Sequence, residues 1–81
     1  MNPLQLIQGS FEKEDALDLI TELVQVKIRY HENKIGRSEN EEDIERREGR
    51  IRQLQMDLSK LREEFNQQNN RIAIQSNIEI A

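Results

Sequence analysis

The sequence has no cysteine and no tryptophan, and it contains only one proline and three glycines among 81 residues. The absence of cysteine excludes disulfide bonds, thiolate metal sites and thiol nucleophiles. Aromatic residues make up only 4% of the chain, so a thick globular core is not expected. A chain of this length forms one domain and buries only about 60% of the surface that its unfolded form exposes. The composition therefore favours helices that bury narrow apolar stripes.

Long apolar runs and an excess of basic charge are also missing. No stretch approaches the roughly 20 apolar residues that cross a bilayer, and residues 1–10 lack the features of a signal peptide. The formal net charge of −4 disfavours an anionic membrane surface and nucleic acid as partners, because phosphate binding needs concentrated Lys and Arg. We therefore expect a cytoplasmic protein with no membrane partner, and nucleic-acid binding is a less favoured hypothesis.

Apolar residues recur every seven positions through the second half of the chain, with leucines between them. The repeat comprises Ile44, Ile51, Leu54, Leu58, Leu61, Phe65 and Ile72. Such spacing predicts a helix, over residues 38–70, with a coiled-coil-like seam along one face. Arg47 and Gln68 occupy the two remaining positions of the repeat, so the seam is most apolar in its middle.

Capping signals predict a first helix over residues 10–36. Ser10 can cap its start, and acidic residues follow in the first turn, where the positive end of the helix dipole favours them. Gly36 suits the left-handed residue that commonly ends a helix. Ser38 and Glu41 have the spacing of a capping box, which begins the second helix almost at once. Because the connection is so short, the sequence predicts an antiparallel two-helix hairpin.

The first helix carries two apolar stripes, whereas the second helix has only its seam. Projection at about 100° per residue separates the two stripes by about 120°. The stripe that we expect to pack on the second helix comprises Leu17, Ile20, Val24, Ile28 and His31. The other, which we call the outer stripe, comprises Leu19, Leu23, Val26 and Tyr30.

One neighbouring helix can cover only one of these stripes, so the outer stripe needs a second neighbour. We predict that it forms a homodimer contact, which brings two hairpins together as a four-helix bundle. The alternative is that the extended N-terminal segment, residues 1–9, folds back over the outer stripe within one chain.

The last part of the chain changes from a period of seven to a period of two. Apolar and polar residues alternate, and the apolar positions are Ile72, Ile74, Ile78 and Ile80. This pattern predicts a short β-strand within residues 71–81. A single strand needs a partner, either residues 4–6 at the same end of the hairpin or the tail of a second copy. The other interpretation is a frayed terminus.

No residue pattern points to catalysis, a cofactor or a metal ion. His31 is the only histidine, and its place on an apolar stripe indicates a half-buried packing residue. Glu14, Asp18 and Glu22 recur every four residues, which is typical of a solvated helix face. The arginine run over residues 46–52 is largely matched by acids four positions earlier. No phosphate-binding loop or nucleophile elbow occurs, so we expect that the protein is not an enzyme.

Three segments together resemble a known type of protein. They are N-P-L-Q-L-I-Q-G-S-F-E-K-E-D-A at residues 2–16, V-K-I-R-Y-H-E-N-K at residues 26–34, and a leucine-spaced helix with an Ile-rich tail. In this respect the chain resembles small uncharacterised bacterial proteins of the helical-hairpin type, a resemblance that implies no catalytic or binding residue. We expect a structural or protein-interaction protein, a homo-oligomeric helical hairpin that presents its helix faces or its C-terminal strand. The alternative is an acidic antitoxin-like or chaperone-like adaptor subunit.

Overall fold

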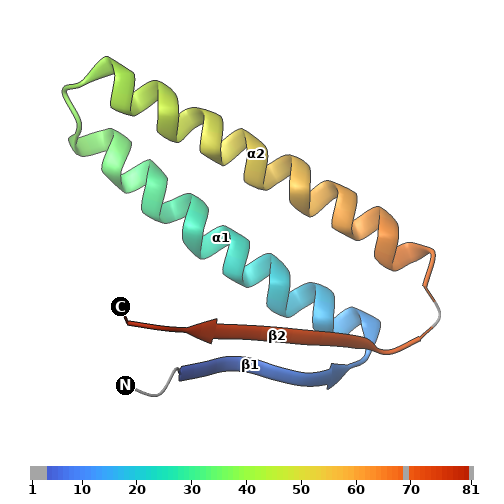
Figure 1. Ribbon diagram of the computed structural model, residues 1–81. Helices are drawn as coiled ribbons and strands as arrows, with labels where there is room; N and C mark the ends of the chain where they lie inside the picture. The colour runs from blue at the N-terminus through green and yellow to red at the C-terminus, as the bar shows by residue number, and fades with distance from the viewer. Residues whose placement is uncertain (1–3, 69, 81) are drawn as a thin grey trace.

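The chain folds as a helical hairpin with a small sheet at its base. The computed structural model describes residues 4–68 and 70–80. Its elements, in chain order, are β1 (Leu4–Phe11), α1 (Lys13–Arg37), α2 (Glu41–Asn66) and β2 (Ile72–Ile78). The helices lie side by side and antiparallel, and the strands form a two-stranded antiparallel sheet next to the start of α1 (Figure 1). The described part is therefore mainly helical, with one short sheet.

Ser10 does not cap the first helix, contrary to the prediction. It lies in β1, and the N-cap residue of α1 is Glu12, whose side chain makes no capping hydrogen bond. The Oγ of Ser10 instead accepts a hydrogen bond from Arg71 Nε at 3.1 Å, and its carbonyl oxygen accepts one from Arg71 Nη2 at 2.7 Å. The helix begins three residues later than predicted because strand pairing extends through Phe11.

The connection between the helices also differs from the prediction. Gly36 remains helical, α1 ends at Arg37, and Gly9 alone among the described residues has a positive φ. Asn40 caps α2 in place of Ser38, because its Oδ1 accepts a hydrogen bond from the backbone N–H of Asp43 at 3.2 Å. The chain leaves α1 in extended backbone, with φ −93° and ψ 137° at the C-cap, so no left-handed residue is needed.

The seam between α1 and α2 contains most of the buried side chains. Ile28, Leu54, Leu58 and Phe65 are buried. The other residues predicted for the seam are partly exposed: Leu17, Ile20, Val24, His31, Ile44, Ile51 and Leu61. The hairpin therefore has a narrow core, as the composition predicts.

The C-terminal strand pairs with the N-terminal segment of the same chain. The register runs from Phe11 opposite Ile72 to Leu4 opposite Ile78, with a bulge between Gln5 and Ile7. Along β2 the partly covered residues are Ile72, Ile74 and Ser76, and the residues between them are exposed. One face of the sheet is thus turned inward, and Ile80 lies beyond the paired residues.

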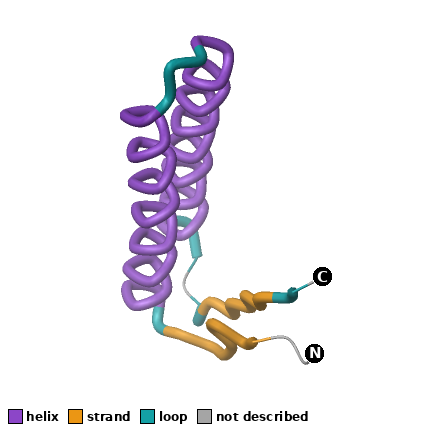
Figure 2. The backbone as a smooth tube through the Cα atoms, turned by 90° about the vertical axis from the view of Figure 1, so that its left-hand side faces the viewer, coloured by secondary structure: helices purple, strands orange, loops and turns teal. Residues whose placement is uncertain are grey.

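α1 is the central element of the fold. It contacts α2 and both strands, whereas α2 contacts α1 alone among the described elements. Figure 2 shows the strands running outward from the base of the hairpin. The radius of gyration is 15.3 Å, against about 11.7 Å for a compact chain of this length. The single chain is therefore open on the side of α1 that α2 does not cover.

Candidate functional site

The outer stripe of α1 becomes more exposed along the helix. Leu19 is partly exposed, Leu23 is 37% exposed, Val26 54% and Tyr30 53%. Figures 1 and 2 place the sheet beside the first turns of α1, so it can cover only the beginning of this stripe. Most of the residues predicted for a dimer contact thus remain open in the single chain.

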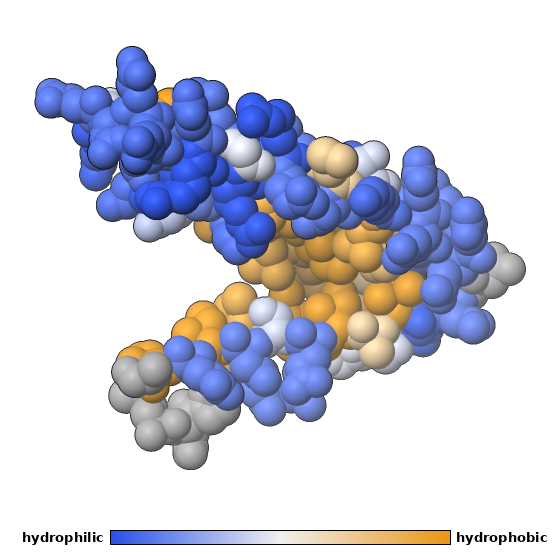
Figure 3. Space-filling view, turned by 45° about the horizontal axis from the view of Figure 1, so that its top comes forward, coloured by the Kyte–Doolittle hydropathy of each residue, from blue (hydrophilic) through white to orange (hydrophobic). Residues whose placement is uncertain are grey.

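The outer ends of the two strands add to this apolar surface. Leu4 is 59% exposed, Ile78 45% and Ile80 70%. Figure 3 shows apolar side chains lining the hollow between the helices and the strands. We define the open apolar surface as these three residues together with Leu23, Val26 and Tyr30. It joins residues from both ends of the sequence and from the middle of α1.

The chain exposes more surface than a compact domain of its mass. Its accessible area is 6627 Å², whereas a 9.6 kDa monomer is expected to expose about 5,100 Å². The excess of about 1,500 Å² is larger than the roughly 800 Å² that each partner contributes to a stable protein interface. The extended shape thus leaves enough area for a specific protein contact.

A second, polar feature lies near the connection between the helices. It is a groove of about 440 Å³, and its lining consists of His31 of α1 and Arg46, Arg47, Gly49, Arg50 and Gln53 of α2. The groove brings together the lone histidine and most of the arginine run. Its position beside the hairpin end makes it distinct from the ends of the strands.

Arg47 is the central group of this groove. Its Nε donates a hydrogen bond to Asp43 Oδ2 at 3.1 Å, and its Nη1 lies 3.1 Å from His31 Nδ1. Its guanidinium carbon is 5.8 Å from the centre of the Tyr30 ring, within range of a cation–π contact. The seam position that the heptad leaves polar is therefore occupied by a tethered arginine that touches both helices.

The surroundings of His31 favour its neutral form. Burial lowers the pKa of His31, and the positive charges of Arg47, Lys27 and Arg50 lower it further. A neutral imidazole whose Nδ1 accepts from Arg47 carries its proton on Nε2, and that atom is buried without a hydrogen-bond partner among residues 4–68 and 70–80. The hydrogen bond from Arg47 in turn lowers the pKa of Asp43, against the opposing effect of desolvation. His31 is thus partly buried at the hairpin end and lies in contact with Arg47.

The groove has limited chemical capacity. Guanidinium groups can bind a carboxylate or a phosphate, but Arg46 and Arg47 both contact Asp43. Within residues 4–68 and 70–80, no three His, Cys, Asp or Glu side chains gather to hold a metal ion. In the same part of the chain, neither helix has the length and apolar character needed to cross a membrane.

Two residues that matter in the structure carry no strong signal in the sequence. Ala16 is completely buried. It falls between the two apolar stripes of α1, and only its small size indicates in the sequence that it is packed against a neighbour. Arg71, which directly precedes β2, donates a hydrogen bond to Ser10 of β1, 61 positions earlier in the sequence. Nothing in the local pattern around Arg71 indicates that partner.

Comparisons with known proteins add no further information. No protein-family model, no curated protein and no solved structure matches the chain. We therefore infer the function from the geometry of the chain.

Proposed function

We propose that this chain is a structural protein-interaction module that works as a homodimer, with the outer stripe of α1 at the contact between two hairpins. The contact brings four helices together. The exposure of the open apolar surface is the observation that supports the proposal most, with Val26 at 54% and Tyr30 at 53%. Large contiguous apolar surfaces of this kind mark protein interaction sites in soluble proteins.

A second copy is the occupant that the surface favours. A two-fold interface must be complementary to itself, because the same patch faces its own copy. An apolar patch meets this condition, whereas a patch of one charge would repel itself. The excess area of about 1,500 Å² per chain also exceeds what each partner of a standard interface buries. Self-association would therefore cover the open apolar surface without any other protein.

The proposed dimer acts by presenting surfaces. Burial and the charge of Arg47 lower the pKa of the lone histidine, His31, and so favour its neutral form. The polar outer faces of both α2 helices stay available in such an assembly, since α2 contacts no described element of the chain other than α1. The module therefore offers two copies of each outer face to further partners.

Sedimentation velocity over a concentration series tests this proposal, with one variant in the contact and one matched control. Val26→Glu places a carboxylate in the proposed contact and should raise the dimer dissociation constant about 100-fold or more, because burying an unpaired charge costs several kcal/mol. The control is Met56→Glu, since Met56 is 53% exposed but lies two residues from both Leu54 and Leu58. It therefore points away from the seam.

The expected result is a dimer for the wild-type chain and for Met56→Glu, and a folded monomer for Val26→Glu. Circular dichroism checks that each variant keeps its helices. A folded wild-type monomer at every concentration would overturn the proposal. Equal weakening of the dimer by both variants would also overturn the proposal, because a charge on the outer stripe would then matter no more than a charge on the outer face of α2.

A further inference from the structure

The two strands differ in how their free edges are protected. β1 carries a bulge between Gln5 and Ile7 and has Gly9 at φ +146°, both of which disturb a regular edge. β2 runs from Ile72 to Ile78 without a bulge, a proline or a charged residue. Natural proteins usually protect an edge strand by one of these devices, because an unprotected edge pairs with another strand. The free edge of β2 is therefore ready for pairing.

We propose that β2 pairs antiparallel with β2 of a second copy, with Gln75 at the two-fold axis. The result is a four-stranded sheet in the order β1, β2, β2, β1. This inference rests on the homodimer proposed above and specifies how its two chains are joined. A two-stranded sheet is marginal on its own, whereas four strands with an apolar face are stable.

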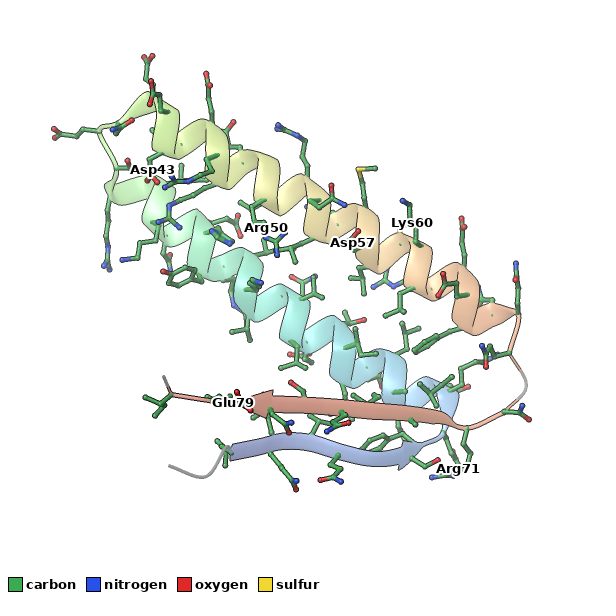
Figure 4. All side chains as sticks on the ribbon, viewed as in Figure 1. Asp43, Arg50, Asp57, Lys60, Arg71 and Glu79 are labelled. Atoms are coloured by element: carbon green, nitrogen blue, oxygen red, sulfur yellow. The ribbon has the colours of Figure 1, made fainter. Side chains whose placement is uncertain are left out.

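Charge complementarity selects this register. Arg71 and Glu79 are the charged residues nearest to the two ends of β2, and Figure 4 shows them near opposite ends of the strand. Pairing about Gln75 sets Arg71 of each copy opposite Glu79 of the other, so opposite charges face each other at both ends of an uncharged strand, while Nε and Nη2 of Arg71 keep their hydrogen bonds to Ser10 of β1. All seven residues of β2 then find a partner. Centring the pair on Ile74 or Ser76 leaves both charges without their opposite and shortens the paired region.

The apolar face of the sheet is compatible with the same register. Residues directly opposite each other point to the same side of an antiparallel sheet. Pairing about Gln75 puts Ile72 opposite Ile78 of the second copy and Ile74 opposite Ser76, so the inward faces become continuous. Ile78, which is 45% exposed in the single chain, gains an apolar neighbour. Centring the pair on Ile74 or Ser76 would also keep the isoleucines on this face, so the charges at the strand ends distinguish the three registers.

Single cysteines provide the test, because the natural chain has none. Gln75→Cys should form a disulfide between two copies in oxidised glutathione, since opposite Cα atoms are about 4.5–5.5 Å apart and a disulfide spans about 4.4–6.8 Å. Ala73→Cys alone and Asn77→Cys alone should not form a disulfide. In each of these variants the two equivalent thiols, one in each chain, lie about 13 Å apart. A mixture of these two variants should form a mixed disulfide. Gln8→Cys is the matched control on β1.

We expect cross-linking of Gln75→Cys, and of the mixture, to be at least about tenfold faster than that of Ala73→Cys or Asn77→Cys alone. All of these positions are exposed, so the fold should survive. Equal rates for all variants, or preferred cross-linking through Gln8→Cys, would overturn the β2 pairing. If the wild-type chain is still a dimer that Val26→Glu dissociates, the homodimer stands and only the pairing fails. A wild-type monomer would overturn both.

Discussion

The two helices have nearly equal lengths but very different surroundings. α1 has 25 residues and contacts α2 and both strands, whereas α2 has 26 residues and, of the elements that the structure describes, contacts α1 alone. Their sequences differ in the same way, because α1 has two apolar stripes and α2 has one. The helix with two apolar stripes therefore has more neighbours than the helix with one. The chain covers the outer stripe only in part, and this exposure supports the contact with a second copy proposed above.

The seam should be far more sensitive to truncation than the outer stripe. Phe65 is 7% exposed and Tyr30 is 53% exposed. On the Val26→Glu background, which we expect to be monomeric, Phe65→Ala should lower the free energy of unfolding by about 3–5 kcal/mol, because it leaves a cavity. Tyr30→Ala should lower it by less than about 1 kcal/mol. Urea denaturation measures both, and similar losses would contradict the difference between the two faces.

Enlarging the smallest buried residue should disturb the junction of α1 with its neighbours. Ala16 is 0% exposed, so Ala16→Leu should cost about 1–3 kcal/mol through overpacking. Ala73→Leu is the control, because Ala73 lies on the exposed side of β2, and it should change stability by less than about 0.5 kcal/mol. Thermal unfolding compares the two. An Ala16→Leu variant as stable as the wild type would mean that α1 is not tightly held at this point.

Removing the tie between the ends of the chain should loosen the sheet and leave the seam intact. Arg71→Met removes both hydrogen bonds to Ser10 and should cost about 1 kcal/mol, which is about a fivefold loss of protection in amide hydrogen exchange. The loss should be confined to β1 and β2. Arg62→Met, at an exposed arginine of α2, is the control. Equal loss of protection across α2 would show that the sheet and the hairpin unfold together.

The smallest effect should come from the titration of His31. Its pKa lies below the ordinary value of 6.5, chiefly through burial. As the pH falls, His31 of the unfolded chain therefore binds its proton at a higher pH than His31 of the folded chain. The free energy of unfolding decreases as the pH drops through about 6.5. Above that pH, His31 is neutral in both states and has no effect.

His31→Gln should reduce the fall in unfolding temperature between about pH 7.5 and about pH 5.5. Asp43 does not interfere in this range, because its pKa lies below its ordinary value of 3.8. It loses its contribution to stability only at more acidic pH. The same fall in the wild type and in the variant would mean that the environment of His31 does not differ between the folded and unfolded states.

The periodicity of the sequence predicts the elements but not their ends. Repeats of seven and of two residues are long enough to identify both helices and the C-terminal strand. The ends of the helices depend on neighbours far away in sequence, as Ser10 shows, because Arg71 and the sheet hold it in β1. Local capping signals at Gly36 and Ser38 were wrong for a related reason, since an extended connection and the cap at Asn40 satisfy the same backbone groups.

The sequence predicts the residues of the outer stripe, but it does not predict which segments of the chain lie beside them. The outer stripe follows from helical spacing alone, and the structure leaves Leu23, Val26 and Tyr30 exposed. Alternation in the tail predicts a strand, but it cannot choose between the N-terminal segment and a second copy as partner. The structure gives β2 one partner within the chain and leaves its other edge for the pairing proposed above. The first alternative of the sequence is therefore confirmed, and the second stays a proposal for the free edge of β2.

The position of Leu4 opposite Ile78 has a mechanical consequence. The start of β1 and the end of β2 lie side by side, so a pull on these two points loads the hydrogen bonds of the sheet one after another. The strands would peel apart from this pair toward Phe11 and Ile72, with each step resisted by only about 1 kcal/mol. The helices stay outside the path of the force until the last pair opens. The sheet should therefore open at low force and leave the helical hairpin folded.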